Sequence, residues 1–451
     1  MTSVAVRLAA SIVAVEVGRL SARLREITQD LVLDVVGLCL AARRTDYVRA
    51  ALAAATGGGN STAIGHGRRF DCGQAAVING MAAHGEDFDD TFEGGPIHAG
   101  AVIVPAVLAA AEEFRADGAA VLRGIVIGVE TACRLSLVAP KRVHMAGFHP
   151  TAVLGTMGAA AAVGAMLGLG ERQIVDALGI AGSMAGGIIE YLSDGSWTKR
   201  LHPGWAAQAG IRAALLARHG FVGPTTVFEG THGLFHGFAR SAEGDYGKLT
   251  DGFGTRWLAE TIAFKPFACG TMTHPYIDCA IRLARRGVAV DAVEEMLCEV
   301  GEGTVHRLWE PLAQKQSPPN AYAAKFSTPF CIAAGVVLGD AGLAAFTEET
   351  VRDPRIRSLM RKIRYVVDPD NPYPREFTGH IRAKLRTGEI IEERQPHLRG
   401  GAHEPLSRAA IEAKFFANAA FGGWDRARAE RARDRVQGLF SGAVDLTALR
   451  E

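Results

Sequence analysis

An acid-rich segment between two helical stretches holds the residue types best suited to chemistry. It reads His84-Gly-Glu-Asp-Phe-Asp-Asp-Thr-Phe-Glu-Gly-Gly-Pro-Ile-His98 and combines carboxylates with two histidines. Residues 75–83 before it and 102–114 within the following stretch have apolar residues at helical spacing, and Gly94-Gly95-Pro96 interrupts the pattern. The segment is therefore predicted to be a helix end and a loop held by rigid helices, a common setting for binding and catalysis.

Four residues, one of them His98 of this segment, would suit chemistry on small carboxylic acids. Removing a proton beside a carboxylate, or eliminating water or carbon dioxide from a citrate-like acid, needs cations for the carboxylates and a base that titrates near neutral pH. His98 and His149 are the candidates for acid/base chemistry, and Lys199 and Lys265 are the candidates for carboxylate binding. An arbitrary lysine is usually a solvated charge, and an arbitrary histidine is usually a packed or capping residue. Only the positions of these four residues within sequence motifs can therefore distinguish a functional role from a structural one.

Three more residues are candidates for supporting roles. Asp87 and Thr91 are four positions apart, which would place them on one face of a helical turn, and Asp87 could orient a histidine or hold a substrate hydroxyl. His202 follows Lys199 by three positions and could support it. The other ionisable residues near these motifs are interpreted as helix caps, solvated charges or structural groups: Asp89, Asp90, Glu93, His84, Cys269 and His274.

The order of these motifs resembles the MmgE/PrpD family over nearly the whole chain. The motifs are Asp87-Phe88-Asp89-Asp90-Thr91 with His98, Gly147-Phe148-His149-Pro150-Thr151, Lys199-Arg200-Leu201-His202-Pro203-Gly204, Phe264-Lys265-Pro266-Phe267 and Glu412-Ala413-Lys414-Phe415. Family members include 2-methylcitrate dehydratase, cis-aconitate decarboxylase and iminodisuccinate epimerase, so membership leaves the reaction open. The resemblance implies a mainly α fold, a large all-α domain with an inserted smaller α+β lid domain, and a homodimer.

The resemblance also assigns roles to the candidate residues. It implies a metal-free and cofactor-free site for a small di- or tricarboxylate, with catalytic His98, His149 and Asp87 and with substrate-binding Thr91, Lys199, Lys265 and His202. At Phe330 many relatives carry tyrosine, so this chain keeps the ring but lacks the hydroxyl. We therefore expect a dehydratase or decarboxylase, with an epimerase of an iminodisuccinate-like acid and a non-catalytic polycarboxylate-binding protein as alternatives.

The hydrophobic pattern predicts two kinds of domain. Before residue 267 apolar residues recur at helical spacing, with Gly or Pro in the gaps, and predict helices at 24–42, 47–55, 101–114, 119–137, 151–167, 171–183 and 206–219. Residues 1–17 are interpreted as a first amphipathic helix rather than a signal peptide, because charges interrupt them.

After residue 267 the pattern becomes mixed. Helices are predicted at 271–286 and 326–339, and β-branched stretches predict strands at 295–308, 362–367, 380–385 and 390–394, the last two joined by a hairpin turn at 386–389. Helical patterning returns at 408–419 and 424–439. We therefore predict a discontinuous all-α domain of residues 1–267 and 401–451 around an α+β domain of residues 268–400.

Composition limits the partners. The 451 residues include 49 basic and 48 acidic side chains, a balance that favours neither nucleic acid nor an anionic membrane as a partner. The 7 cysteines are scattered without a CxxC pair, which predicts free thiols and a cytoplasmic location. Residues 151–170 carry no charge, but they are mostly Ala and Gly and are interpreted as a packed helix rather than a membrane span.

A rival interpretation starts from the same acidic segment. Asp89-Asp90-Thr91-Phe92-Glu93 is similar to the motif with which prenyl-transfer enzymes bind magnesium diphosphate. No second acidic motif follows on a later helix, and the α+β segment does not fit that architecture. No His/Cys cluster has zinc-ligand spacing, and no glycine-rich nucleotide motif lies between a strand and a helix.

Overall fold

The chain forms two compact units in the computed structural model, which describes residues 2–95 and 97–450. The first unit comprises Met1–Gly85, Asp89–Phe264 and Ser407–Glu451, and the second comprises Glu86–Phe88 and Lys265–Leu406. The sequence placed these boundaries at residues 267/268 and 400/401, a few residues from those of the compact units. Met1 of the predicted first helix and Pro96 of the predicted break lie outside the described residues.

The first unit is built mainly of helices. The predicted helices are present, most with small differences at their ends, but the helix predicted to begin at residue 206 begins at Thr198. In chain order they are α1 (Val4–Val13), α2 (Ala22–Ala42), α3 (Asp46–Ala54), α4 (Cys72–His84), α5 (Gly100–Phe114), α6 (Gly118–Val138), α7 (Arg142–Met145), α8 (Pro150–Met166), α9 (Glu171–Met184), α10 (Tyr191–Asp194), α11 (Thr198–Arg218), α12 (Leu234–Ala239), α13 (Gly247–Thr250), α21 (Arg408–Phe421) and α22 (Arg426–Gln437).

Small residues allow the central helices of this unit to approach closely. All of α8 is buried, and it packs against α6 and α11. Where α4 meets α11, a Cβ atom added to Gly80 would lie 2.6 Å from the Cα of Gly204, so neither position has room for a side chain. This contact fixes the C-terminal end of α4 relative to the start of α11, and both ends carry candidate residues.

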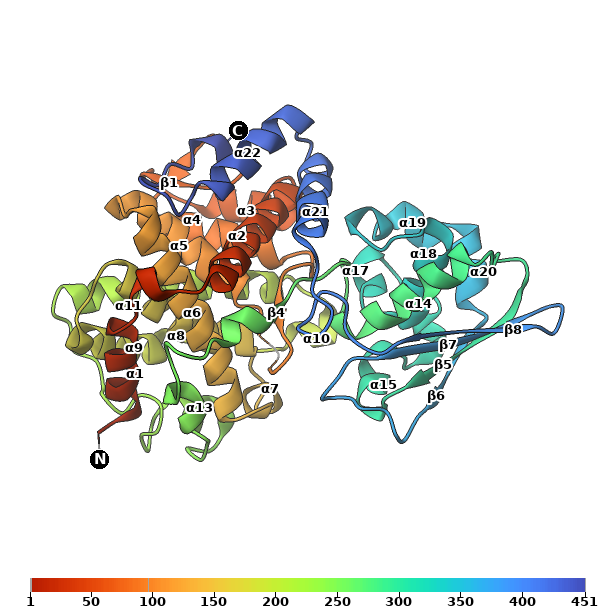
Figure 1. Ribbon diagram of the computed structural model, residues 1–451, viewed down its shortest axis with the longest axis horizontal. Helices are drawn as coiled ribbons and strands as arrows, with labels where there is room; N and C mark the ends of the chain where they lie inside the picture. The colour runs from red at the N-terminus through yellow and green to blue at the C-terminus, as the bar shows by residue number, and fades with distance from the viewer. Residues whose placement is uncertain (1, 96, 451) are drawn as a thin grey trace. The chain divides into compact units, whose positions relative to one another are not determined.

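The C-terminal segment completes the core of the first unit. In Figure 1 the blue helix α21 lies beside the red helix α2, against which it packs. Lys414 on α21 pairs with Asp34 on α2 at 2.7 Å, and both side chains are buried. Because a buried charge is stable only when it is paired, this contact ties two segments that are distant in sequence.

The first unit also contains two short antiparallel ladders, which corrects the all-α prediction. Strand β1 (Ser61–Thr62) pairs with β2 (Arg69–Phe70), and β3 (Thr91–Phe92) pairs with β4 (Ile262–Ala263). The second ladder places Thr91 opposite Ala263. Strands of two residues are too short for an alternating pattern to reveal them in the sequence.

The second unit is an α+β structure around a four-stranded sheet of order β6-β5-β7-β8. Strand β5 (Val293–Val300) runs parallel to β6 (Ile363–Val367) and antiparallel to β7 (Gly379–Leu385), which forms the predicted hairpin with β8 (Ile390–Gln395). Helix α14 (His274–Arg285) packs on β7 and β8, and α18 (Thr328–Leu338) packs on α14 (Figure 1). The shorter helices are α15 (Glu302–Leu308), α16 (Leu312–Lys315), α17 (Ala321–Ala324), α19 (Glu348–Arg352) and α20 (Pro354–Met360).

One predicted strand was wrong over half of its length. The prediction of a strand at 295–308 holds only to Val300, because Gly301 ends it and serves as the N-cap of α15. The apolar residues of the following seven positions are too few to distinguish a short helix from a strand.

Two predictions from composition concern the whole described chain. All seven cysteines are free and buried, as predicted. Among the residues described, no helix combines the length and apolar character that a membrane crossing needs.

Candidate active site

A carboxylate–imidazole pair lies where α4 ends. His84, the last residue of α4, places its Nδ1 2.7 Å from Oδ2 of Asp89, and both side chains are fully buried. Because an ionised carboxylate only accepts, Nδ1 of His84 carries the hydrogen. The interpretation of Asp89 as a solvated or capping charge was wrong, since the loop after α4 folds back and buries it.

The loop before α5 fixes the orientation of His98. Its Nδ1 lies 2.7 Å from the carbonyl oxygen of Asp90, which can only accept, so Nδ1 donates and Nε2 holds the lone pair in the neutral ring. The carboxylate of Asp90 accepts from the N–H of Gly100, the first residue of α5, at 3.1 Å. The N–H of His98 donates to Oγ1 of Thr151 at 3.2 Å, which joins this loop to the start of α8.

A second pair of histidines lies at the start of α8. His149 is the N-cap residue of α8, and its N–H donates to the carbonyl of Gly187 at 2.8 Å. Its Nδ1 lies 3.1 Å from Nδ1 of His202 on α11. One of these nitrogens must donate and the other accept, so the two neutral rings adopt opposite tautomers at this contact. His202 therefore contacts His149, whereas the sequence had paired it with Lys199.

These residues form one group, named here the histidine cluster: His84, Asp89, His98, His149 and His202. The ring of His84 lies 5.0 Å from that of His98 and 5.6 Å from that of His149, and the ring of His149 lies 5.2 Å from that of His202, measured between centroids. The fold thus brings together His98, His149 and His202, which the sequence predicted as site residues. It adds His84 and Asp89, for which the sequence predicted structural or solvated roles.

Burial keeps two histidines of the cluster neutral. It lowers the pKa of His149 well below its usual value, and the positive charges of His84 and Lys199 lower it further. Burial followed by the same two charges lowers the pKa of His202 to about 4. Both rings are therefore neutral at pH 7 and can accept a proton, but neither holds a proton to give. Lys199 is half-buried at the start of α11 and supplies a cation whose field reaches both rings.

The second unit contains a separate lysine group. Nζ of Lys265 donates to the carbonyl of Asp87 at 2.8 Å, and Nζ of Lys325 donates to the carbonyl of Glu86 at 2.7 Å. The hydroxyl of Tyr322 donates to Oδ2 of Asp87 at 3.3 Å. Both lysines are buried, so these contacts replace their hydration. Lys325 and Tyr322 were not predicted, because they lie outside the motifs that singled out the other residues.

The predicted relation between Asp87 and Thr91 was wrong. Asp87 has a left-handed backbone, with φ of 55°, and belongs with Glu86 and Phe88 to the second unit. Thr91 lies on β3 in the first unit, so the two residues do not share the face of a helical turn. Aspartate tolerates left-handed backbone better than most residues, and one such residue is enough to stop a helix from continuing.

Three members of the cluster are metal-ligand types. The ligand atoms of His84, Asp89 and His98 all lie within 4.8 Å of one another, although the sequence had indicated no such cluster. Nδ1 of His84 donates to the carboxylate of Asp89, and Nδ1 of His98 donates to the carbonyl of Asp90. Because Nδ1 of each ring carries a hydrogen, neither Nδ1 can bind an ion in this arrangement.

Phe330 lies in the core of the second unit. It is fully buried on α18, and its ring centroid lies 5.6 Å from that of Phe346. The ring of Phe330 therefore packs against an aromatic neighbour.

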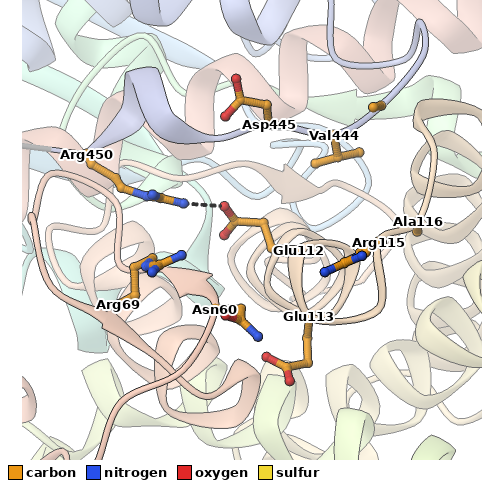
Figure 2. Close-up of a pocket in the computed structure, with 10 residues that line it drawn as sticks. Asn60, Arg69, Glu112, Glu113, Arg115, Ala116, Val444, Asp445 and Arg450 are labelled. Carbon is orange, nitrogen blue, oxygen red and sulfur yellow. Dashed lines mark hydrogen bonds and ion pairs between the residues drawn. The ribbon is translucent and has the colours of Figure 1, made fainter.

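A cavity of the first unit has a different character from the cluster. It has a volume of about 430 Å³ and is lined by both basic and acidic side chains. None of the candidate residues lies in its wall. Figure 2 shows Arg450 extending toward Glu112, with which it forms an ion pair at 3.0 Å. The other charged residues of the wall are Arg69, Arg115, Glu113 and Asp445. Arginines and acids are present in equal number, so the wall favours neither an anion nor a cation.

The mainly helical scaffold buries neutral imidazoles and a carboxylate, side-chain types that enzymes use for acid/base chemistry. The chain belongs to the MmgE/PrpD family: residues 6–246 match the MmgE/PrpD N-terminal domain, and residues 267–438 match the MmgE/PrpD C-terminal domain.

Relatives agree with this assignment. The chain is 30% identical to cis-aconitate decarboxylase of Mus musculus, over 76% of this chain and 71% of the relative. It is 31% identical to cis-aconitate decarboxylase of Homo sapiens, over 76% and 72%. It is 25% identical to cis-aconitate decarboxylase of Aspergillus terreus, over 78% and 75%. The chain is accordingly an enzyme, of lyase type like these relatives.

Proposed function

We propose that this enzyme decarboxylates cis-aconitate or a closely similar small di- or tricarboxylate, without a metal or a cofactor. The observation that carries the proposal is the buried, neutral pair of His149 and His202 beside the charge of Lys199. The names of the relatives support decarboxylation rather than another reaction of the family.

The residues of the first unit suit the steps of such a reaction. Decarboxylation breaks a carbon–carbon bond, leaves the electron pair on the substrate and requires a proton to be added to a substrate carbon. Lys199 would bind a carboxylate of the substrate, because an ammonium group forms charge-assisted hydrogen bonds with carboxylate oxygens. His98 and His149 would move protons through Nε2, since the hydrogen-bond contacts with Asp90 and His202 involve Nδ1 of each ring.

Other roles follow from the resemblance to the family. We infer that Asp87 takes part in catalysis and that Thr91, Lys265 and His202 help to bind substrate. We also infer that the second unit acts as a lid and that the enzyme works as a homodimer. The homodimer is supported by large apolar side chains that are exposed on the first unit between residues 188 and 205: Ile188, Leu192, Trp197 and Trp205.

The test is turnover of a substrate panel. The enzyme would be incubated with cis-aconitate, citrate, 2-methylcitrate and iminodisuccinate in deuterated water and followed by proton NMR. We expect cis-aconitate to lose one carboxylate and to gain one deuterium on carbon. Conversion of iminodisuccinate alone would identify an epimerase, and tight binding without turnover of any acid would identify a binding protein.

Metal independence has its own test. We expect activity to persist after treatment with a chelator and dialysis, because the proposed proton transfers and carboxylate binding use only side chains of the protein. Loss of activity that only a divalent metal ion restores would contradict this part of the proposal.

A further inference from the structure

The proposed decarboxylation needs a protonated group that the proposed roles do not yet supply. The electron pair that carbon dioxide leaves on the substrate must take up a proton at a substrate carbon. His149 and His202 are neutral at pH 7, so neither ring holds a proton that it can give without becoming an anion. A group that carries an extra proton at rest must therefore lie nearby, or the proton must come from solvent.

His84 has the geometry of such a group. Its Nδ1–H is held by the fully buried carboxylate of Asp89 at 2.7 Å. Its Nε2 is also buried and has no hydrogen-bond partner among the described residues. A buried polar atom without a partner is costly in a folded protein and often marks a position that meets a ligand.

The surroundings of His84 contain both charged and neutral groups. The ring lies beside the rings of His98 and His149, and the guanidinium of Arg200 on α11 donates to the carbonyl of the adjacent Gly85 at 3.0 Å. The ionisable groups around it are Asp89 and His98 from the acidic loop, His149 from the start of α8, and Lys199, Arg200 and His202 from α11. Asp89 is the carboxylate in direct contact, and it favours a positive charge on the ring.

We propose that His84 and Asp89 form a proton-holding pair, in which His84 rests as an imidazolium and gives the proton on Nε2 to the reaction. This inference rests on the proposed function, because decarboxylation is the step that consumes the proton. Asp89 keeps its charge throughout, holds the ring through Nδ1 and stabilises the imidazolium, as a carboxylate does for histidine in other acid/base sites.

The step balances in atoms and charge. The bond between carbon and the leaving carboxylate breaks, its electron pair stays on the substrate, and carbon dioxide leaves. The substrate carbon takes the proton from Nε2 of His84, either directly or through the neighbouring ring of His149. His84 becomes neutral and regains a proton from solvent before the next cycle.

The geometry favours His84 over His98 for this role. Oδ2 of Asp89 lies 2.7 Å from Nδ1 of His84 but 3.6 Å from Nδ1 of His98. Nδ1 of His98 instead donates to the carbonyl of Asp90, an uncharged acceptor. The carboxylate therefore stabilises a positive charge on His84 more than on His98.

The first test needs no substrate. Isotope-labelled imidazole nitrogens would be observed by NMR in the full-length enzyme at pH 7, with the His84 signals assigned by their loss in His84→Gln or by their shift in Asp89→Asn. We expect both ring nitrogens of His84 to be protonated. A neutral His84 ring in the wild-type enzyme would overturn the proposal, whether or not cis-aconitate is the substrate.

The second test uses kinetics with cis-aconitate. We expect His84→Gln to lower kcat at least about a hundredfold while KM changes less than about threefold, as for removal of a general acid. In Asp89→Asn the basic limb of the kcat profile should move to lower pH, because the imidazolium loses its counter-charge. Unchanged kcat and an unchanged pH profile in both folded variants would overturn the proposal.

A matched control separates the two proposals. His219 is exposed at the end of α11, so His219→Gln should keep the wild-type kinetics and melting temperature. If the wild-type enzyme decarboxylates neither cis-aconitate nor another acid of the panel, the proposed function fails, and the protonation of His84 measured by NMR still decides whether the pair holds a proton.

Discussion

Protonation of His202 should link pH to the stability of this enzyme. The pKa of His202 is about 4 in the folded chain, against an ordinary value of 6.5, because burial and two nearby positive charges disfavour the imidazolium. Between these values the unfolded chain binds a proton that the folded chain excludes. The free energy of unfolding must therefore decrease as pH falls from about 6.5 toward about 4, and this loss is absent above pH 7.

The magnitude follows from the same two values. A pH of 5 is about one and a half units below the ordinary pKa of histidine and still above the pKa of His202 in the folded chain. Each of these units changes the free energy of unfolding by about 1.36 kcal/mol. His202 should therefore lower the free energy of unfolding by about 2 kcal/mol between pH 7 and pH 5. The lowered pKa of His149 also decreases the free energy of unfolding as pH falls. This contribution of His149 should largely remain when His202 is replaced.

The perturbation is His202→Gln, which retains hydrogen-bonding groups for Nδ1 of His149 but cannot titrate. Urea unfolding would be followed at pH 7 and pH 5 by tryptophan fluorescence, for which Trp197 and Trp205 lie at the start of α11 beside His202. We expect the wild-type enzyme to lose about 2 kcal/mol more than the variant over this range. His219→Gln, on the surface, should behave like the wild type. Equal losses in the wild type and in His202→Gln would refute the reasoning.

Four further predictions follow from the same contacts. His149→Ala should lose at least about a hundredfold in rate on the substrate that the wild type converts, and full activity would remove His149 from the chemistry. Lys199→Ala should weaken binding of cis-aconitate by about 1.5 to 3 kcal/mol in calorimetry, whereas Lys248→Ala on the surface should not. Lys414→Met should destabilise the first unit by about 3 to 5 kcal/mol in urea, because it leaves a buried aspartate without its cation, and a loss below about 1 kcal/mol would contradict this. Trp205→Glu should convert a homodimer to a monomer by light scattering, and a monomeric wild type at micromolar concentration would disprove the dimer.

The local elements of this fold were largely readable from the sequence. Helices such as α2, α6 and α9 were predicted because their apolar spacing and their Gly or Pro boundaries depend only on near neighbours in the chain. The hairpin between β7 and β8 was predicted for the same reason. The error at residues 302–308 arose where a short helix follows a strand with only Gly301 between them.

The family was also readable from the sequence, and with it the identity of several candidate residues. His98, His149 and Lys199 were named because short motifs carry them in a fixed order. Motif order reports ancestry, so it can name a residue without giving the partner, burial or protonation state on which its chemistry depends.

Those properties were decided by tertiary structure. The contact between His149 and His202 joins residues 53 positions apart, and it exists because α8 and α11 pack together. Asp89 lies in the same acidic run as Glu93, which is half-buried, but only Asp89 is buried against His84, since the loop after α4 turns back on the helix end. Hydrophobic spacing indicates which face of a helix is buried. The contacts and protonation states of the side chains on that buried face are set by the packing of helices that are distant in sequence.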